Sequence, residues 1–109
     1  MPDPVLLFRY SALTFNGHRI HYDRDYAVNE EGYPGLVVQG PLTASLLLDM
    51  MYRQLGAVTV KTFSFRGAKP LFDTGSFLLE GAIEQQSVKL WALTPDRQLA
   101  MSLDIELAQ

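Results

Sequence analysis

A chain of 109 residues with 48% hydrophobic residues has the size and composition of one compact domain, and we expect residues 1–109 to form a single domain. Its formal net charge of −3 argues against nucleic-acid binding, which normally uses a basic face. The absence of cysteine excludes disulfides, iron–sulfur clusters and thiolate chemistry, and it suits a reducing compartment.

The amino-terminal residues Met1–Pro4 lack the basic start and the apolar run of a signal peptide. The longest nearly apolar segments are shorter than the roughly 20 residues that a helix needs to span a bilayer. We therefore expect a soluble, cytoplasmic protein that does not insert into a membrane.

The first third of the chain lacks a long, regular hydrophobic period. Because β-branched and aromatic residues occur there, the segment Val5–Leu13 is predicted to form a strand. The stretch Asp23–Glu31 is predicted to be a short helix, with Asp23 as its N-cap and Gly32 just past its end. Residues Leu36–Val38 are predicted to form a brief buried strand.

The most regular helical segment is Leu42–Leu55, which is rich in leucine, alanine and methionine. Pro41 suits the first helical turn, where its missing N–H costs nothing, and Gly56 marks the end. The segment is apolar on nearly every face, so we expect other structure to enclose it.

The second half of the chain is predicted to form strands. In the last of them, apolar residues from Leu99 to Leu107 alternate with Ala, Ser, Asp and Glu, and Thr94–Asp96 is a turn signal before it. The expected fold class is thus α+β, an antiparallel sheet wrapped around one long helix. The predicted strands are Val58–Phe65, Ser76–Ile83, Val88–Leu93 and Leu99–Leu107.

Both histidines, His18 and His21, lie within the segment Ala12–Asp23, together with Asn16, Arg19 and Tyr22. Histidine exchanges protons near neutral pH, so the cluster favours a site of acid–base chemistry. A single histidine would more often only make a structural hydrogen bond. The pair His18-x-x-His21 could also bind a metal, but a third ligand such as Asp23 or Asp25 would be needed, and we expect no metal.

The second candidate element is Gln39-Gly40-Pro41, at the start of the long helix. A helix amino terminus presents unpaired N–H groups and a partial positive charge, and glycine lets a ligand approach the backbone closely. This geometry suits a thioester oxygen that gains negative charge during reaction, and we assign thioester binding to Gly40 and Leu42. The simpler interpretation is a turn followed by a helix start.

These residues resemble a known family. The run Asn16–His21 occupies the place of the Asp-x-Asn-Pro-x-His signature of MaoC-like (R)-specific enoyl-CoA hydratases and dehydratases, and Gly40-Pro41 occupies the place of the His-Gly pair that opens their central helix. The segments Ser11–Asp23 and Glu31–Val38 resemble most closely the carboxy-terminal domain of 3-methylfumaryl-CoA (mesaconyl-CoA) hydratase-like proteins, which are related to mitochondrial 3-hydroxyacyl-thioester dehydratases. The resemblance covers nearly the whole chain.

The resemblance implies a hotdog fold and a hydro-lyase that interconverts 2-enoyl and 3-hydroxyacyl thioesters. The acyl carrier would be coenzyme A or an acyl carrier protein, the acyl group could be a methyl-branched dicarboxylate such as 3-methylfumaryl, and coenzyme A would enter only as part of the substrate. His21 matches the family's general acid/base, and Gly40 matches the glycine whose N–H binds the thioester oxygen. The family's aspartate falls on Asn16, an amide that can orient water but cannot act as a base.

The remaining residues of the cluster, Arg19, His18 and Tyr22, are expected to bind substrate. For Arg19, a surface ion pair with Asp23 or Asp25 is an equal alternative. Weaker candidates for contacts to carrier phosphates are Arg53, Lys61, Arg66 and Lys69, for which a solvated surface position is the simpler interpretation. Gln39 replaces a histidine that many family members carry.

Family members commonly contain two hotdog domains in one chain, with the active site between them. The resemblance therefore implies a homodimer, or a heterodimer with another hotdog chain. Apolar bulk at Trp91, Leu93 and Leu78 on outward positions indicates either a subunit interface or core packing. Two alternatives stay open: a partner-dependent, non-catalytic subunit, and a thioesterase in which Asp49 is the only acid on the long helix.

Overall fold

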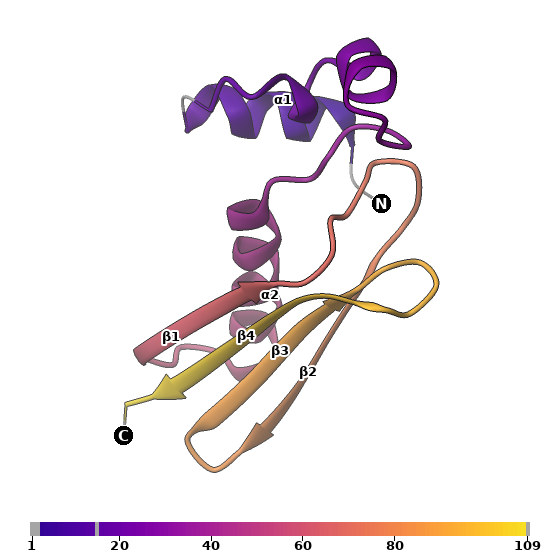
Figure 1. The fold of residues 1–109 in the computed structure, drawn as a ribbon. Helices are drawn as coiled ribbons and strands as arrows, with labels where there is room; N and C mark the ends of the chain where they lie inside the picture. The colour runs from indigo at the N-terminus through magenta and orange to yellow at the C-terminus, as the bar shows by residue number, and fades with distance from the viewer. Residues whose placement is uncertain (1–2, 15, 109) are drawn as a thin grey trace.

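The computed structural model describes residues 3–14 and 16–108, so Met1, Pro2, Phe15 and Gln109 lie outside the described residues. Its four strands form one antiparallel sheet in the order β1-β4-β3-β2, with the helix α2 on one face and α1 beyond one end of α2 (Figure 1). The predicted α+β class is therefore confirmed. In chain order the elements are α1 (Pro4–Leu13), η1 (Arg19–His21), η2 (Tyr26–Glu30), α2 (Gly40–Leu55), β1 (Val60–Gly67), β2 (Leu78–Glu84), β3 (Ser87–Leu93) and β4 (Leu99–Leu107).

The first element corrects the sequence prediction, because Val5–Leu13 belongs to helix α1 and does not form a strand. The carboxylate of Asp3 accepts a hydrogen bond from the Val5 N–H at 2.7 Å, and Pro4 occupies the first turn. Leu7 and Ser11, four residues apart, are the buried side chains of α1, as expected for one face of a helix. An Asp-Pro helix start therefore prevailed over local composition.

The predicted helix at Asp23–Glu31 is confirmed as one short α-turn that continues into the π-helical turn η2. The Asp23 carboxylate accepts the Tyr26 N–H at 3.1 Å, which satisfies one of the free donors of the helix start. Gly32 follows in the left-handed region at φ +76°. The segment Leu36–Val38 is buried and extended as predicted, but it pairs only through a bridge between Val37 and Phe72.

Helix α2 provides most of the helical contribution to the core. It packs against β2, β3 and β4, and it ends at Gly56, whose φ is +78°. The expected enclosure on nearly every face is incomplete within one chain, because Ser45, Asp49 and Arg53 form an exposed stripe along the helix. The buried side chains of α2 are Leu42, Thr43, Ala44, Leu47 and Met51.

The sheet follows the predicted strands to within two residues at each end, and β4 has the predicted bounds. From Met101 to Leu107 every second residue of β4 is buried on the α2 side. Leu99 breaks this pattern and is 44% exposed, since the β3–β4 register shifts between Ala92 and Leu93. The predicted turn at Thr94–Asp96 is present, with the Thr94 N–H donating to the Gln98 carbonyl at 2.8 Å.

The outward face of the sheet carries the apolar side chains that the sequence singled out. Leu78 and Leu93 are paired neighbours on β2 and β3, and Leu78 is 38% exposed. Trp91 is half-buried, and its indole N–H donates to the Glu80 carboxylate at 2.9 Å. The subunit-interface interpretation of this face stays a prediction.

Truncation of the core side of α2 is expected to destabilise the fold. Leu47 is fully buried, so Leu47→Ala should lower the free energy of unfolding by about 2–5 kcal/mol, through lost burial and the cavity left behind. Urea denaturation measures the change. Leu13→Ala is the matched control, because Leu13 is 81% exposed and should lose less than about 0.5 kcal/mol. Equal losses in the two variants would contradict the described packing.

Candidate functional site

His21 lies at the end of η1 with its side chain buried. Its Nδ1 is 2.7 Å from the carbonyl oxygen of Val37. A carbonyl only accepts hydrogen bonds, so Nδ1 carries the proton, and Nε2 of the neutral ring has a free lone pair. The described geometry therefore fixes which nitrogen of His21 can take a proton.

The hydrogen bond to Val37 also fixes where His21 lies in the fold. Val37 precedes Gly40, the first residue of α2, by three residues, so their Cα atoms lie at most about 11 Å apart. The Val37 N–H in turn donates to the Ile20 carbonyl at 2.8 Å. The imidazole of His21 is thus held beside the segment that enters the amino terminus of α2.

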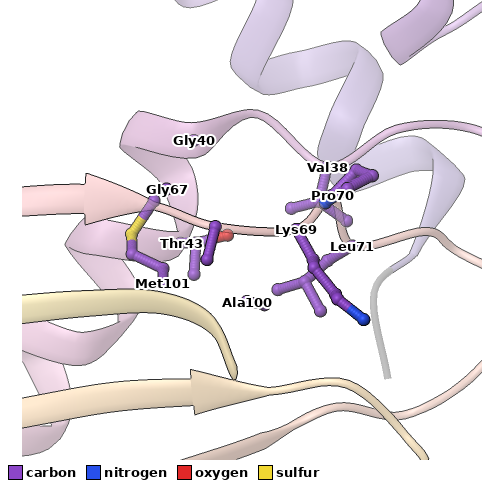
Figure 2. Close-up of a pocket in the computed structure, with 10 residues that line it drawn as sticks. Val38, Gly40, Thr43, Gly67, Lys69, Pro70, Leu71, Ala100 and Met101 are labelled. Atoms are coloured by element: carbon purple, nitrogen blue, oxygen red, sulfur yellow. The ribbon is translucent and has the colours of Figure 1, made fainter. Parts of the chain in front are cut away.

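The amino terminus of α2 opens into a cavity of about 320 Å³ (Figure 2). Gly40 and Leu42 carry N–H groups that a helix leaves without an internal partner, Pro41 has none, and the Gln39 cap makes no side-chain hydrogen bond to the helix start. A Cβ on Gly40 would lie 3.7 Å from the Met101 side chain, an ordinary van der Waals distance, so packing does not require glycine here. The glycine instead keeps its own N–H accessible from the cavity. The cavity is lined by Val38, Gly40, Thr43, Gly67, Ala68, Lys69, Pro70, Leu71, Ala100 and Met101.

Asn16 faces a different cavity, of about 300 Å³, which it lines with Phe8, Gly17 and Tyr22. The Asn16 side-chain oxygen accepts the His18 N–H at 3.1 Å, and the Tyr22 hydroxyl donates to the Gly17 carbonyl at 3.1 Å. Among the described residues, neither cavity includes His21 in its lining. The structure therefore brings His21 to the amino-terminal end of α2, but it does not join Asn16 and Gly40 in one cavity of a single chain.

The other residues of the histidine cluster lie near the surface. The His18 ring is exposed and nearly parallel to that of His21, with 6.2 Å between ring centroids. Arg19 pairs with Asp23 at 2.8 Å and covers the Tyr26 ring at 4.3 Å. The ion pair that the sequence offered as an alternative for Arg19 is thus present.

The same ion pair determines the state of Asp23. Hydrogen bonds from Arg19 and from the Tyr26 N–H hold the pKa of the Asp23 carboxyl below its usual value. A carboxylate so stabilised is a weak proton acceptor. Asp23 is therefore a poor replacement for the family's aspartate, whose place is taken by Asn16 in this chain.

Two polar side chains near the site make long-range contacts that the sequence did not indicate. The fully buried Gln39 amide donates to the Leu7 carbonyl at 2.8 Å and to the Ser11 hydroxyl at 2.9 Å, which ties α1 to the start of α2. The buried Asp73 carboxylate pairs with Arg24. Both contacts join residues 25 or more positions apart, which local pattern does not reveal.

The acid on α2 is remote from this site. Asp49 is exposed and pairs with Arg53 at 2.9 Å, and nine residues of helix separate it from Gly40 by about 14 Å along the axis. Within residues 3–14 and 16–108, His, Asp and Glu side chains form no group of three or more that could hold a metal ion. Over the same described ranges, no helix has both the length and the apolar character needed to cross a membrane.

Comparison with known protein families gives a match over most of the chain. A family model described as hydroxyacyl-thioester dehydratase type 2 matches residues 1–73. The chain is 52% identical over 107 residues to mesaconyl-C(4)-CoA hydratase of Chloroflexus aurantiacus, over 98% of this chain and 38% of that protein. It is 43% identical over 74 residues to a mitochondrial hydroxyacyl-thioester dehydratase type 2 of Schizosaccharomyces pombe, over 65% of this chain and 24% of that protein. The chain thus spans well under half the length of these relatives.

Solved structures with similar folds share little sequence with this chain. An (R)-hydratase from A. caviae involved in PHA biosynthesis superposes with a TM-score of 0.84 at 18% identity, over 96% of this chain and 86% of that one. The ChsH1–ChsH2 complex from Mycobacterium tuberculosis gives 0.76 at 20% identity, over 98% and 87%. These likenesses concern the fold alone, and they confirm the predicted hotdog.

The lowered pKa of Asp23 makes its contribution to stability dependent on pH. Because the pKa is lower in the folded chain, the stabilisation is present above the unfolded value near 3.8 and is lost as the pH falls through the folded pKa. Asp23→Asn keeps a side chain that can cap the helix but removes the charge. Thermal unfolding should show a slightly lower Tm than wild type at pH 7, and the difference should shrink as the pH falls below 3.8.

Asp25→Asn is the control for this comparison, since it removes an exposed carboxylate two residues away. At pH 7 the Tm of Asp25→Asn should differ less from that of wild type than the Tm of Asp23→Asn does. A Tm difference for Asp23→Asn that persists unchanged at low pH would contradict the ion-pair explanation.

Proposed function

Since the chain belongs to the hydroxyacyl-thioester dehydratase type 2 family, we propose that it adds water to 2-enoyl thioesters and removes it from 3-hydroxyacyl thioesters. The observation that carries the proposal is the buried His21 ring, whose Nδ1 donates to the Val37 carbonyl and whose Nε2 makes no hydrogen bond to the residues that the structure describes. This acid–base group lies beside a helix start with free N–H donors, which is the combination that this chemistry needs.

In the proposed hydration, the thioester oxygen accepts hydrogen bonds from the N–H groups of Gly40 and Leu42. His21 Nε2 removes a proton from water while the water oxygen bonds to C3, and the double-bond electrons move onto the thioester as an enolate. The positive end of α2 stabilises that charge. His21 then returns the proton to C2, and dehydration runs the same steps in reverse.

The remaining cluster residues have positioning roles in this scheme. The Asn16 amide orients the water, because it can donate and accept hydrogen bonds but cannot take a proton. His18, Arg19 and Tyr22 are assigned to substrate binding. His18 is exposed beside His21, whereas Arg19 and Tyr22 would have to exchange their bonds to Asp23 and Gly17 for bonds to a substrate.

The proposed substrate class is a short, methyl-branched dicarboxylyl thioester such as 3-methylfumaryl-CoA. The cavity at the start of α2 is small, and most of its lining is apolar. Lys69 lines it as a cation, and its ammonium donates to the amide oxygen of Gln98, a neutral partner that leaves the positive charge uncompensated. A terminal acyl carboxylate would neutralise that charge. The similarity to a mesaconyl-C(4)-CoA hydratase supports the same class.

The proposed active unit contains a second hotdog, either another copy of this chain or a different chain. Two aromatic side chains on the edge strand β1, Phe63 and Phe65, are 55% and 49% exposed. A second unit that covers them would bury this apolar surface, and two similar solved structures are complexes of two chains. Light scattering is expected to report a mass of twice 12.2 kDa or more, or association with a second hotdog chain.

A partner-dependent, non-catalytic subunit is the second candidate function. The amide of Asn16, in place of the family's acid, favours it. Turnover that needs a second hotdog chain and is unchanged by His21→Asn would support this candidate, whereas turnover that His21→Asn abolishes would support the leading proposal.

Substitution of His21 tests the proposed chemistry. His21→Asn keeps a donor for the Val37 carbonyl but removes the proton acceptor, so kcat should fall by about 10²–10⁴-fold. Loss of enoyl-thioester absorbance with crotonyl-CoA and 3-methylfumaryl-CoA measures the rate. Lys89→Gln, an exposed change on β3, is the control and should keep wild-type turnover. Unchanged turnover in His21→Asn would rule out the assigned role.

Substitution of Lys69 tests the substrate class. Lys69→Met should raise KM for 3-methylfumaryl-CoA by about ten- to a hundredfold, the effect of losing one hydrogen bond between charged groups, and should leave the uncharged acyl group of crotonyl-CoA nearly unaffected. Lys89→Met, at an exposed lysine on β3, is the matched control. Equal increases in KM for both substrates would indicate that Lys69 binds the carrier, and they would contradict its proposed role with the acyl carboxylate.

A further inference from the structure

Asp73 is a buried carboxylate that the proposed chemistry does not use. It lies between β1 and β2, and its side chain is 1% exposed. Its carboxylate accepts the Leu36 N–H at 2.9 Å and the Arg24 guanidinium at 3.1 Å, with a second, shorter contact to the same guanidinium. A buried carboxylate destabilises the fold unless hydrogen-bond donors surround it. The donors around Asp73 come from separate segments of the chain, so the carboxylate holds these segments together.

The two segments that Asp73 joins lie on either side of the His21 hydrogen bond. Arg24 follows His21 by three residues, and Leu36 directly precedes Val37, whose carbonyl binds His21 Nδ1. The Asp73 carboxylate therefore acts as a clamp on the chain at two points. It holds Arg24, just after His21, and Leu36, just before Val37, whose carbonyl accepts the His21 hydrogen bond.

Backbone hydrogen bonds complete the connection. The Asp73 N–H donates to the Leu36 carbonyl at 3.0 Å, and the Val38 N–H donates to the Leu71 carbonyl at 2.8 Å. Both contacts flank the bridge between Val37 and Phe72. The peptide unit that orients His21 is thus fixed against residues 71–73.

Gly35 is the residue that permits this close approach. A Cβ at this position would lie 2.7 Å from the Asp73 carboxylate oxygen and 2.7 Å from the Thr74 methyl group, both too short for real contacts. The hydrogen bond from Arg24 to Asp73 also raises the pKa of the guanidinium, so Arg24 stays charged at any pH used for assay. The contact between the Leu36 segment and Asp73 is therefore close, and its cationic partner keeps its charge.

We propose that Asp73 and Arg24 are positioning residues for the acid–base reaction, which they serve by holding the Leu36–Val37 backbone so that the Val37 carbonyl fixes the tautomer and direction of the His21 ring. The inference rests on the proposed function for its catalytic consequence, but its effect on the ring does not depend on catalysis. A shift of about 1 Å in such a carbonyl is enough to cost roughly a hundredfold in rate, because general acid–base catalysis requires close alignment.

The test uses the full chain with Arg24→Met, Arg24→Lys and Asp73→Asn. Nitrogen-15 NMR of the imidazole reports which ring nitrogen carries the proton. In wild type, His21 should be protonated on Nδ1 when neutral, and in Arg24→Met the two tautomers should mix. With crotonyl-CoA, kcat should fall about 10–100-fold in Arg24→Met with KM changed less than about threefold, and Arg24→Lys should recover part of the loss.

Arg24→Met is the primary variant because Arg24 is about half exposed, whereas Asp73→Asn could unfold the chain; circular dichroism and Tm identify that case. Arg97→Met is the matched control, because it removes an arginine from the surface pair with Glu80 at 3.7 Å. It should change neither the tautomer nor kcat.

The outcomes separate the two proposals. A tautomer and kcat in Arg24→Met that equal those of wild type would overturn the positioning role. Wild type that stays inactive both alone and with a second hotdog chain, together with a tautomer shift in Arg24→Met, would support the clamp and contradict the proposed function. A fall in kcat without any change of tautomer, matched by Arg97→Met, would show a general loss of stability and would also overturn the positioning role.

Discussion

The hydrogen bond between His21 Nδ1 and the Val37 carbonyl is the contact on which the candidate site depends. Val37 lies in a buried, extended segment, where backbone polar groups must find partners inside the protein. Its N–H and its carbonyl both pair with the η1 region, through Ile20 and His21. Val37 therefore has both of its backbone polar groups hydrogen-bonded, and its carbonyl at the same time orients the His21 ring.

The buried segment also explains why His21, the proposed acid–base group, lies at the start of α2. Val37 leads directly to Gln39, whose side chain is fixed to α1 through Leu7 and Ser11, and then to Gly40. The helix α1, the short helices η1 and η2 and the long helix α2 are all held through these few residues. A displacement of residues 36–39 would move the His21 ring relative to the amino terminus of α2. In the proposed function, the rigidity of this segment therefore determines whether both groups can act on one substrate.

The sequence was sufficient to predict the parts of the fold that arise from local signals. The bounds of β4 follow from strict alternation, and the cap at Asp23 and the ends of α2 at Pro41 and Gly56 follow from residue chemistry. Helix α1 was predicted wrongly, because its short amphipathic pattern buries only Leu7 and Ser11. The ion pair of Arg24 with Asp73 joins residues 49 positions apart, so no spacing rule could have indicated it.

A single chain leaves the site divided, and this division is a consequence of its geometry. Asn16 and Gly40 line separate cavities, and the buried His21 contributes to neither lining. Water for hydration would have to reach His21 Nε2 from the Asn16 side while the thioester enters from the Gly40 side, so a surface that joins the two cavities must form before reaction. Phe63 and Phe65 leave apolar area uncovered on β1, and burial of such area favours association. A second hotdog unit would therefore have a source of binding energy that is independent of the substrate. In the proposed function, the assembled pair, more than the single chain, is the unit whose chemistry the His21 geometry would serve.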